Sequence, residues 1–367
     1  MSRRIRVAVL FGGRSSEHQI SCVSAGSVLA ALDRNRYDVV PIGITREGRW
    51  VLAADDPAAL SASGGVLPTV SDSGTAVAIP GDPSVGGVLQ LAPGELPTVL
   101  AEVDVVFPIL HGPYGEDGTI QGLLELAGVP YVGSGVLASA VSMDKEYMKL
   151  LLAARGLPVG PFVVIRNSDW LTDPGNALDA VDDLGYPVFV KPARGGSSIG
   201  ISKVGDRAGL TAAIELARGS DPKVIVEKGL AGREVECAVL DGVGGEGPQA
   251  SVPAEIHLGA GFEFYDFEAK YLADATTFDI PALLDGKTTD EVRRVAVETF
   301  VALDCAGLAR VDFFITDQGL VVNEINTMPG FTPTSMYPRM WAASGIDYPA
   351  LVDRLVQLAL ERGTGLR

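Results

Sequence analysis

Two carboxylates and an amide, on Asp312, Glu324 and Asn326, lie in two short apolar runs near the end of the chain. The runs read ARVDFFIT and LVVNEIN, and Asp-Gln-Gly separates them. Two such runs around a three-residue loop with a left-handed glycine are typical of an antiparallel hairpin. In a hairpin centred on Gln318, Asp312 lies opposite Glu324. Arg310 then lies opposite Asn326, and the alternation of strand side chains puts all four on one face.

This arrangement brings the Cβ atoms of the two acidic residues to about 5 Å, where like charges repel each other. A divalent cation between them removes the repulsion. Hard oxygen ligands without a neighbouring His or Cys favour Mg²⁺ or Mn²⁺ over Zn²⁺. The alternative is a solvated polar face on an edge hairpin. We favour the metal site, because the opposite face already supplies apolar side chains for a core: Val311, Phe313, Ile315, Val321 and Ile325.

A second candidate is the glycine- and serine-rich loop at residues 192–200, PARGGSSIG, which the pattern places between strands at 187–191 and 201–204. Its backbone N–H groups could cradle phosphate oxygens. Lys191 at the end of the strand and Lys145 on a helix at 144–155 could add positive charge. The loop is not a P-loop, because the G-x-x-x-x-G-K-[ST] spacing is absent. A flexible turn is the alternative.

The elements that must position these residues follow an α/β pattern. Residues 5–11 and 37–45 read as buried strands. Between them, residues 16–19 (SEHQ) fit a capping box that opens a helix to about residue 32. This βαβ order predicts a parallel sheet. Another strand at 103–110 ends at His111, which is either a ligand contact or a packing residue, because loops at the carboxyl ends of strands bind ligands.

The remaining segments complete the prediction. Residues 53–97, rich in Ala, Ser, Gly and Pro, read as a loop-rich insertion. Helices are expected at 119–127 and 290–303, strands at 130–133, 223–227 and 233–240, and mostly helix at 341–362. Residues 259–277 are aromatic, polar and flanked by glycine, as in a loop that covers a ligand.

Composition excludes several classes of protein. A length of 367 residues suggests two or three domains. The net charge of −17 disfavours a nucleic-acid partner. No apolar run reaches the length of a membrane span, and the N-terminus lacks a signal-peptide cleavage site, so we expect a cytoplasmic protein with no membrane partner. The three cysteines lack zinc spacing and read as buried apolar residues.

A series of motifs, in order along the chain, resembles those of the D-alanine–D-alanine ligases, a family of the ATP-grasp superfamily. They are FGGRSSEHQIS, LHGPYGEDGTIQG, MDKEYMK, FVKPARGGSSIG, VEKGLAGREVEC, FYDFEAKY, ARVDFF and NEINTMPGFTPTS. The resemblance implies an α/β fold (α+β overall) with three domains. These are an N-terminal α/β parallel-sheet domain that binds substrate (1–140), a central ATP-grasp domain (141–230), and a C-terminal ATP-grasp domain with the metal site and covering loop (231–367).

The resemblance also implies a nucleotide site and two metal ions. ATP would contact Lys145, Lys191, Ser197, Ser198, Glu227, Lys228, Leu230, Glu234, Lys270, Asn323 and Glu324. Of these, Lys145 and Lys191 would hold the phosphates under the loop with Ser197 and Ser198. Asp312 and Glu324 would bind one Mg²⁺ or Mn²⁺ ion, and Glu324 and Asn326 a second.

By the same resemblance, the substrates are two molecules of D-alanine and ATP. Glu17 would bind the ammonium of the first D-alanine, and the second would be bound through its carboxylate. The expected substrate contacts are Glu17, His111, Lys270, Arg310, Ser335 and Met336. Arg310 and the backbone N–H of Gly330 would stabilise a tetrahedral oxyanion, while a plain ion pair is the alternative for Arg310. Glu17, Ser197 and Tyr271 would form a hydrogen-bonded set.

The implied reaction is ATP-dependent synthesis of D-alanyl-D-alanine through an acylphosphate, for peptidoglycan precursors, by a homodimer. Ester-forming relatives typically carry Phe at the position of Tyr271, so Tyr271 favours the dipeptide. The alternatives are a D-alanine–D-lactate ligase or another ATP-grasp carboxylate–amine ligase. A dinucleotide-dependent oxidoreductase fails on glycine spacing, because FGGRSSEH lacks the G-x-G-x-x-G pattern. A non-catalytic ATP sensor should have lost a metal ligand or Arg310.

Overall fold

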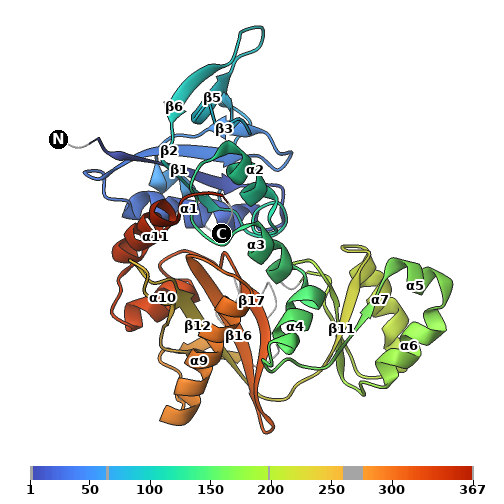
Figure 1. Cartoon of the computed structure of the whole chain (residues 1–367). Helices are drawn as coiled ribbons and strands as arrows, with labels where there is room; N and C mark the ends of the chain where they lie inside the picture. Colours follow the sequence, from blue (N-terminus) through green and yellow to red (C-terminus); the bar gives the residue numbers. More distant parts are fainter. Residues whose placement is uncertain (1–2, 63–65, 197–198, 259–275, 366–367) are drawn as a thin grey trace.

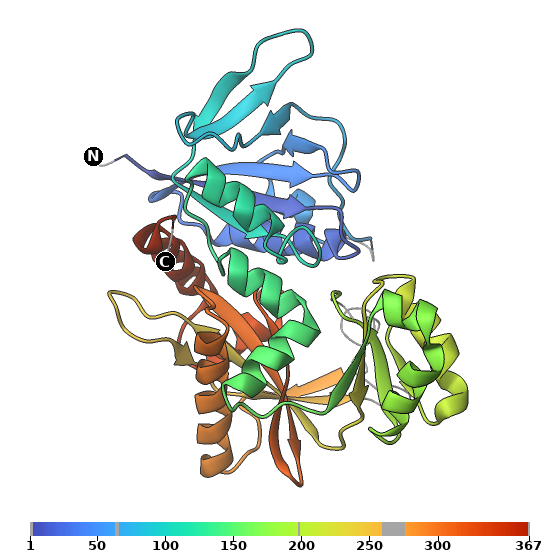
Figure 2. The ribbon, with the colours of Figure 1, turned by 45° about the vertical axis from the view of Figure 1, so that its right-hand side comes forward.

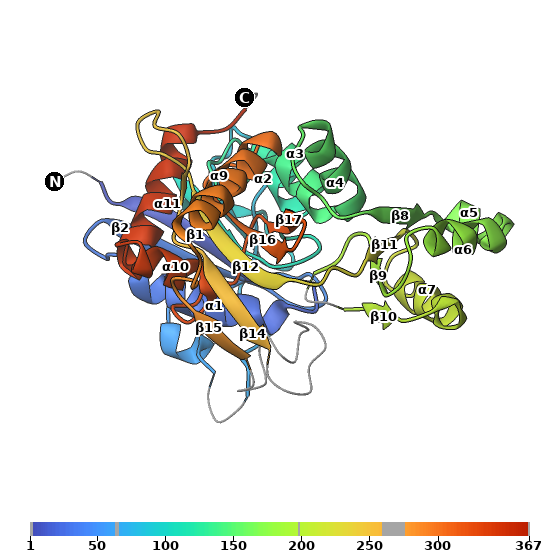
Figure 3. The same ribbon diagram turned by 90° about the horizontal axis from the view of Figure 1, so that it is seen from below.

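The computed structural model describes residues 3–62, 66–196, 199–258 and 276–365. These residues form three β-sheets, with seven, four and six strands. The first sheet lies at the top of Figure 1 and the six-stranded sheet lies below it. The four-stranded sheet stands to one side of the other two, and the view turned by 45° (Figure 2) and the view from below (Figure 3) agree on this placement.

The first sheet has the strand order β6-β5-β4-β3-β2-β1-β7. β1 (Ile5–Gly12) pairs in parallel with both β2 (Tyr37–Ile44) and β7 (Val105–Ile109), which confirms the expected parallel start. β7 is buried along its whole length and β1 along most of it, which is why both strands read as continuous apolar runs. The loops that follow β1 and β7 both contribute residues to one cavity, Glu17 from the first and His111 from the second.

The predicted capping box at the start of α1 (His18–Ala31) is wrong. The N-cap is Glu17, and its side chain makes no capping hydrogen bond. Instead, Ser15 Oγ donates to the carbonyl oxygen of His111 at 2.6 Å and accepts the N–H of Glu17 at 3.2 Å. Bonding between the two loops outcompetes the local cap, and the Glu17 carboxylate is left to line a cavity.

The segment 53–97 is less irregular than predicted. β3 (Trp50–Leu52), β4 (Ala76–Ala78) and β5 (Gly87–Leu91) continue the first sheet with antiparallel pairing, and β6 (Thr98–Glu102) forms its edge. A 3₁₀ turn, η1 (Pro57–Leu60), lies against α1. The strands are only three to five residues long, which is too short for alternation to stand out in the sequence.

The four-stranded sheet has the order β10-β9-β11-β8, with antiparallel neighbours throughout. Its strands are β8 (Phe162–Ile165), β9 (Val188–Pro192), β10 (Ser202–Val204) and β11 (Val224–Lys228). α5 (Asn167–Thr172), α6 (Pro174–Asp182), η2 (Arg207–Gly209) and α7 (Leu210–Arg218) accompany it. The three strands expected here are confirmed within two residues at each end, while β8 and these helices were not predicted.

Three helices connect the first sheet to the four-stranded sheet. They are α2 (Thr119–Ala127), α3 (Val136–Met143) and α4 (Lys145–Ala154). The expected helices at 119–127 and 144–155 are confirmed. The expected strand at 130–133 is reduced to a single bridge between Tyr131 and Val106.

The six-stranded sheet has the order β15-β14-β12-β16-β17, with β13 beside β12. Its strands are β12 (Arg233–Leu240), β13 (Gln249–Ala250), β14 (Ala254–Leu258), β15 (Thr276–Asp279), β16 (Leu308–Thr316) and β17 (Gly319–Asn326). α9 (Gly286–Ala302) packs on this sheet through Val292, Val295, Ala296 and Phe300. The helical segment expected at 341–362 is two helices, α10 (Met336–Ala343) and α11 (Tyr348–Arg362).

The hairpin of β16 and β17 has the predicted pairs but a different turn. Arg310 pairs with Asn326 and Asp312 with Glu324, as expected. Thr316 pairs with Gly319, however, so the turn has two residues instead of three. A β-bulge beside Asp312 restores the register, since Phe313 pairs with Val322 and Asn323 is the extra residue. The core side chain on β17 is therefore the fully buried Val322, and the predicted Val321 lines the cavity.

No helix among the described residues is long and apolar enough to cross a membrane. Cys22 and Cys237 are buried and Cys305 is half-buried, and none forms a disulfide. Burial raises the pKa of each of these thiols to about 12. Cys22 and Cys237 lie in apolar cores, as expected, and Cys305 packs partly buried against one of them.

Candidate active site

A cavity of about 910 Å³ lies where the three sheets meet. The first sheet contributes the loop after β1 and the loop after β7. The four-stranded sheet contributes β9 and β11, and the six-stranded sheet contributes β12, β16 and β17. Most of the predicted residues line it: Glu17, His111, Lys145, Lys191, Glu227, Lys228, Leu230, Glu234, Arg310, Asp312, Asn323, Glu324, Asn326, Gly330, Ser335 and Met336.

Four of the predicted residues, Ser197, Ser198, Lys270 and Tyr271, lie outside the described residues. The predicted covering loop at 259–277 falls there as well, except for its last two residues, which begin β15.

The carboxylate face of the hairpin forms one wall of the cavity. Arg310 donates to both oxygens of Asp312, from Nε and Nη2, at 2.7 Å each. Asn326 Nδ2 donates to Asp312 Oδ2 at 3.1 Å. Glu324 lies 3.7 Å from Lys145 Nζ. Asp312 is thus paired with Arg310, and Glu324 lies near Lys145.

The oxygen donors on this wall fit a divalent cation. Asp312, Glu324 and Asn326 present only hard oxygens from neighbouring strands, a set that suits Mg²⁺ or Mn²⁺. Glu236, on the adjacent strand β12, is opposite Asp312 and lies 3.3 Å from Arg310 Nε. This buried third carboxylate was not predicted, and it makes the wall more acidic than the hairpin alone.

Another group of possible metal ligands lies at the rim, where Glu255, His257 and Asp279 have ligand atoms within 4.8 Å of one another. Arg233 already holds Glu255 through two hydrogen bonds, at 2.7 and 2.5 Å. His257 Nε2 is 2.9 Å from Asp279. We interpret this group as an ion-pair cluster that joins β12, β14 and β15.

A buried carboxylate between two lysines forms the opposite wall. Glu227 lies 2.9 Å from Lys149 Nζ and 2.5 Å from Lys191 Nζ. Burial alone would raise the pKa of Glu227, but Lys149 and Lys191 outweigh it and lower this pKa far below 4.5. Burial opposes the charge of Lys191, and Glu227 in turn raises the pKa of Lys191.

Lys149 was not predicted, although it follows Lys145 by four residues on α4 and therefore shares its face. Lys228 has its ammonium bound to the carbonyl oxygens of Leu184 and Gly185. Apolar side chains around this wall could cover a flat ring: Phe189, Leu230, Phe314 and Val321.

The first sheet supplies a polar wall around His111. Its Nδ1 lies 2.9 Å from the carbonyl oxygen of Met328, which can only accept, so Nδ1 carries the proton. Burial lowers the pKa of His111, which favours the neutral ring, and in the tautomer with the proton on Nδ1 the Nε2 atom accepts from Ser24 Oγ at 3.3 Å. The bonded, buried ring fits the packing role, and a ligand contact stays a prediction for a residue that lines the cavity.

Glu116 was missed by the sequence analysis. Its carboxyl accepts the N–H groups of Gly112 at 2.6 Å and Met328 at 3.3 Å. Burial, together with the nearby charge of Glu17, raises the pKa of Glu116 to about 8. His111 and Glu116 therefore hold both backbone groups of Met328, two residues before Gly330. A motif with His, Gly and Glu after a buried strand was the available signal.

The loop from Met328 to Met336 closes this side. Ser335 is the N-cap of α10, and its Oγ accepts the N–H of Thr332 at 3.1 Å. A Cβ on Gly330 would lie 3.2 Å from Ser335 Oγ, so this glycine lets the backbone approach the serine closely. Gly330 and Arg310 line the same cavity.

The comparisons with known proteins cover nearly all of the chain. Residues 6–134 match the family described as D-ala D-ala ligase N-terminus, and residues 151–357 match D-ala D-ala ligase C-terminus. A D-alanine–D-alanine ligase of Mycobacterium sp. (strain KMS) is 61% identical over 100% of this chain and 99% of its own. One of Nocardia farcinica is also 61% identical, over 100% of both chains.

Solved structures agree. The VanG D-Ala:D-Ser ligase of Enterococcus faecalis has a TM-score of 0.84 and 37% identity, covering 97% of this chain and 100% of its own. The D-alanine–D-alanine ligase of Coxiella burnetii has a TM-score of 0.79 and 35% identity, covering 98% and 95%.

Proposed function

The chain belongs to the D-alanine–D-alanine ligase family, and on that premise we propose that its cavity joins two D-alanine molecules to D-alanyl-D-alanine at the expense of ATP. The product would serve the synthesis of peptidoglycan precursors. The observation that carries the proposal is that two groups of opposite charge line one cavity. Lys145 and Lys191 lie on one side, and the carboxylate face of the hairpin lies on the other.

In the first step, the carboxylate of one D-alanine attacks the γ-phosphorus of ATP and gives an acylphosphate and ADP. Catalysis of such a transfer is mostly positioning and charge neutralisation. Lys145 and Lys191 would hold the phosphate oxygens, with Ser197 and Ser198 above them. Asp312, Glu324 and Asn326 would hold two Mg²⁺ or Mn²⁺ ions, which when bound would neutralise phosphate charge.

In the second step, the amine of the other D-alanine attacks the acyl carbon, and phosphate leaves. A tetrahedral oxyanion forms on the way, and Arg310 together with the N–H of Gly330 would stabilise it. Arg310 is bonded to Asp312 in this structure, so it must share or release that contact. The guanidinium is largely buried beside two carboxylates, Glu236 and Asp312.

The nucleotide and amino-acid contacts complete the proposal. Adenine would lie against Glu227, Lys228 and Leu230, and the ribose at Glu234, while Asn323 is a further proposed contact of ATP. Glu17 would bind the ammonium of the first D-alanine. His111, Lys270, Ser335 and Met336 would contact the substrates, with Lys270 also reaching ATP. Glu17, Ser197 and Tyr271 would form a hydrogen-bonded set across the site.

At the level of the whole chain, we propose domains at 1–140, 141–230 and 231–367. We further propose a homodimer located in the cytoplasm. Sedimentation velocity with the purified protein tests the dimer, and a single species with the mass of one chain would exclude it.

The central test is a Glu324→Gln variant. It keeps the shape of the side chain but removes one charge from the proposed bridge between two cations. We expect phosphate release from ATP and D-alanine to fall by about a hundredfold or more while the circular dichroism spectrum is unchanged. Near-normal turnover at saturating Mg²⁺ would overturn the metal assignment.

A second candidate is a different second substrate, because a relative at 37% identity is a D-Ala:D-Ser ligase. Chromatography of the products from mixtures of D-alanine with D-serine or D-lactate decides between them. We expect D-alanyl-D-alanine to dominate. A preference for either mixed product would keep the ligase class and change the substrate.

A further inference from the structure

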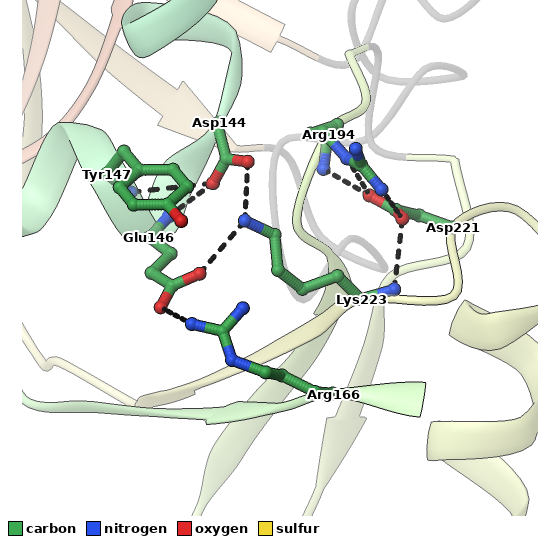
Figure 4. Close-up of polar contacts among 7 residues, drawn as sticks. All are labelled: Asp144, Glu146, Tyr147, Arg166, Arg194, Asp221 and Lys223. Atoms are coloured by element: carbon green, nitrogen blue, oxygen red, sulfur yellow. Dashed lines mark hydrogen bonds and ion pairs between the residues drawn. The ribbon is translucent and has the colours of Figure 1, made fainter. Parts of the chain in front are cut away.

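A network of charged side chains joins the start of α4 to the four-stranded sheet (Figure 4). It contains three carboxylates and three cations: Asp144, Glu146, Asp221, Arg166, Arg194 and Lys223. None of these six side chains lines the cavity, whereas Lys145, between two of them in sequence, does.

Lys223 is the centre of one half of the network. Its Nζ donates to Asp144 Oδ2 at 2.5 Å and to Glu146 Oε2 at 2.9 Å, and it lies 4.6 Å from the centre of the Tyr147 ring. Lys223 and both carboxylates are buried. The other oxygen of Glu146, Oε1, accepts a hydrogen bond from Arg166 Nη2 at 2.5 Å. Removing the lysine would leave Asp144 buried without its cation, a costly state that forces rearrangement.

Asp221 is the centre of the other half. It accepts from the backbone N–H, Nε and Nη2 of Arg194, at 2.9, 3.0 and 2.7 Å. It also accepts the backbone N–H of Lys223 at 3.0 Å. Arg194 is the last residue before the glycines that open the proposed phosphate loop. The network therefore fixes the point at which that loop leaves β9.

Backbone hydrogen bonds connect this network to Lys145. Asp144 is the N-cap of α4 and accepts the N–H groups of Glu146 and Tyr147. The N–H of Lys145 donates to the carbonyl oxygen of Ala193 at 3.0 Å. The N–H of Ala193 in turn donates to the carbonyl oxygen of Lys223 at 2.9 Å. The Nζ of Lys145 donates to Gly195 O at 2.8 Å. Both ends of Lys145 are thus tied to the strand end that Lys223 and Asp221 hold.

We propose that Lys223 is a positioning residue, which through Asp144 sets the place of the Lys145 ammonium and of the backbone at Ala193, Arg194 and Gly195 for binding nucleotide phosphates. This inference rests on the proposed function, in which Lys145 contacts phosphate. Lys223 itself touches neither nucleotide nor amino acid. Its role is to make the N-terminus of α4 and the end of β9 one rigid unit.

The test compares a nucleotide with and without phosphates. In Lys223→Met, we expect kcat/KM for ATP to fall by about tenfold to a hundredfold, the scale of a small misplacement of reacting groups. ADP should bind about tenfold more weakly by calorimetry, while adenosine binding stays unchanged, because the adenine wall at Glu227 and Leu230 is not part of the network. Equal weakening of ADP and adenosine would overturn the proposal.

Asp144→Asn keeps an oxygen acceptor for the N-cap but removes the negative charge that pairs with Lys223. This variant replaces Lys223→Met in the test if Lys223→Met does not fold. It should show the same selective loss for ADP, and ADP binding like that of the parent would overturn the proposal. Arg207→Met is the matched control. It removes an exposed cation with two carboxylate partners, Asp179 and Asp182, from η2 beside the same sheet. Its ADP binding should equal that of the parent protein, and an equal loss there would also count against Lys223.

Lys145→Met separates this inference from the proposed function. If Lys145→Met leaves ADP binding intact, the proposed phosphate contact fails and the role of Lys223 fails with it. If Lys145→Met weakens ADP binding but Lys223→Met and Asp144→Asn do not, only the positioning role is wrong.

Discussion

At the scale of single residues, the charge of Glu227 depends on two lysines that approach it from different elements. Lys149 comes from α4 and Lys191 from β9. All three side chains are largely buried, so each charge relies on its partners far more than a surface pair would. Glu227 thereby fixes α4 against the four-stranded sheet at the proposed adenine wall.

Lys149→Met should lower the free energy of unfolding by about 3 kcal/mol at pH 7, the low end for losing one partner of a buried ion pair, because Lys191 remains. The pKa of Glu227 lies below its unfolded value of 4.5, so the pair stabilises the fold above that pH and less as the pH falls. The variant depresses this pKa less, so its deficit should shrink between pH 7 and pH values below 4.5.

Urea unfolding at several pH values measures this deficit. Lys287→Met, at an exposed position of α9, is the control and should unfold like the parent. A deficit that stays constant as the pH falls far enough below 4.5 to protonate Glu227 in the folded variant would show that Lys149 stabilises the protein through packing and not through the charge of Glu227.

At the scale of elements, the hairpin of β16 and β17 is the clearest case of what sequence can and cannot predict. The pairing of Asp312 with Glu324 was predicted from a hairpin centred on Gln318. The two-residue turn and the bulge at Asn323 compensate each other, so an incorrect turn gave correct pairs. A bulge has no local signature in VVNEIN, because it depends on how β16 and β17 pack.

Other parts of the site could be predicted only to the extent that they are local. The Lys145–Lys149 spacing on α4 was visible, but its partner Glu227 is far away in sequence. The cap at Ser16 failed because the nearby Ser15 bonds to the distant His111 loop. The pairing of Lys223 with Asp144 likewise joins residues 79 apart in the chain. Contacts between residues far apart in the chain decide these features, and such contacts cannot be predicted from the local pattern of a single sequence.

Deleting Asn323 tests the role of the bulge. The deletion removes the extra residue and lets Glu324 pair with Asp312 in a regular ladder. We expect a folded protein whose Mn²⁺ affinity, measured by calorimetry, falls by no more than about tenfold, since the ligands stay opposite each other. ATP turnover should fall further, because Asn323 belongs to the proposed nucleotide contacts.

Deleting Val322 is the matched control for the same strand. It places the amide of Asn323 opposite the buried Phe313, at a cost of about 1–3 kcal/mol for a polar group without a partner. We expect a lower free energy of unfolding here than for the Asn323 deletion. If the two deletions destabilise the protein equally, Asn323 is not the extra residue that sets the register of β17 against β16.

At the scale of the whole molecule, the three sheets do not have three equal cores. One continuous apolar core joins β1, β7 and α1 of the first sheet to α11, α10 and part of β12, with Phe331 packed edge-on against Phe107. The helices and strands of the four-stranded sheet have a core of their own, which includes Val181, Val190 and Ile214. The first and third sheets should therefore behave as one unit, and the four-stranded sheet as another.

Hydrogen exchange followed by mass spectrometry tests this division. Leu355→Ala, in the shared core, should cost about 2–5 kcal/mol and reduce protection in β1 and β7 as well as in β12, because these strands pack on the same side chains. Ile214→Ala removes similar apolar volume from α7, and should reduce protection in β8, β9 and β11 while β1 and β12 keep theirs. If Ile214→Ala instead lowers protection in all three sheets together, the cavity is closed by one cooperative unit. Nucleotide would then enter by global opening and not by movement of the four-stranded sheet.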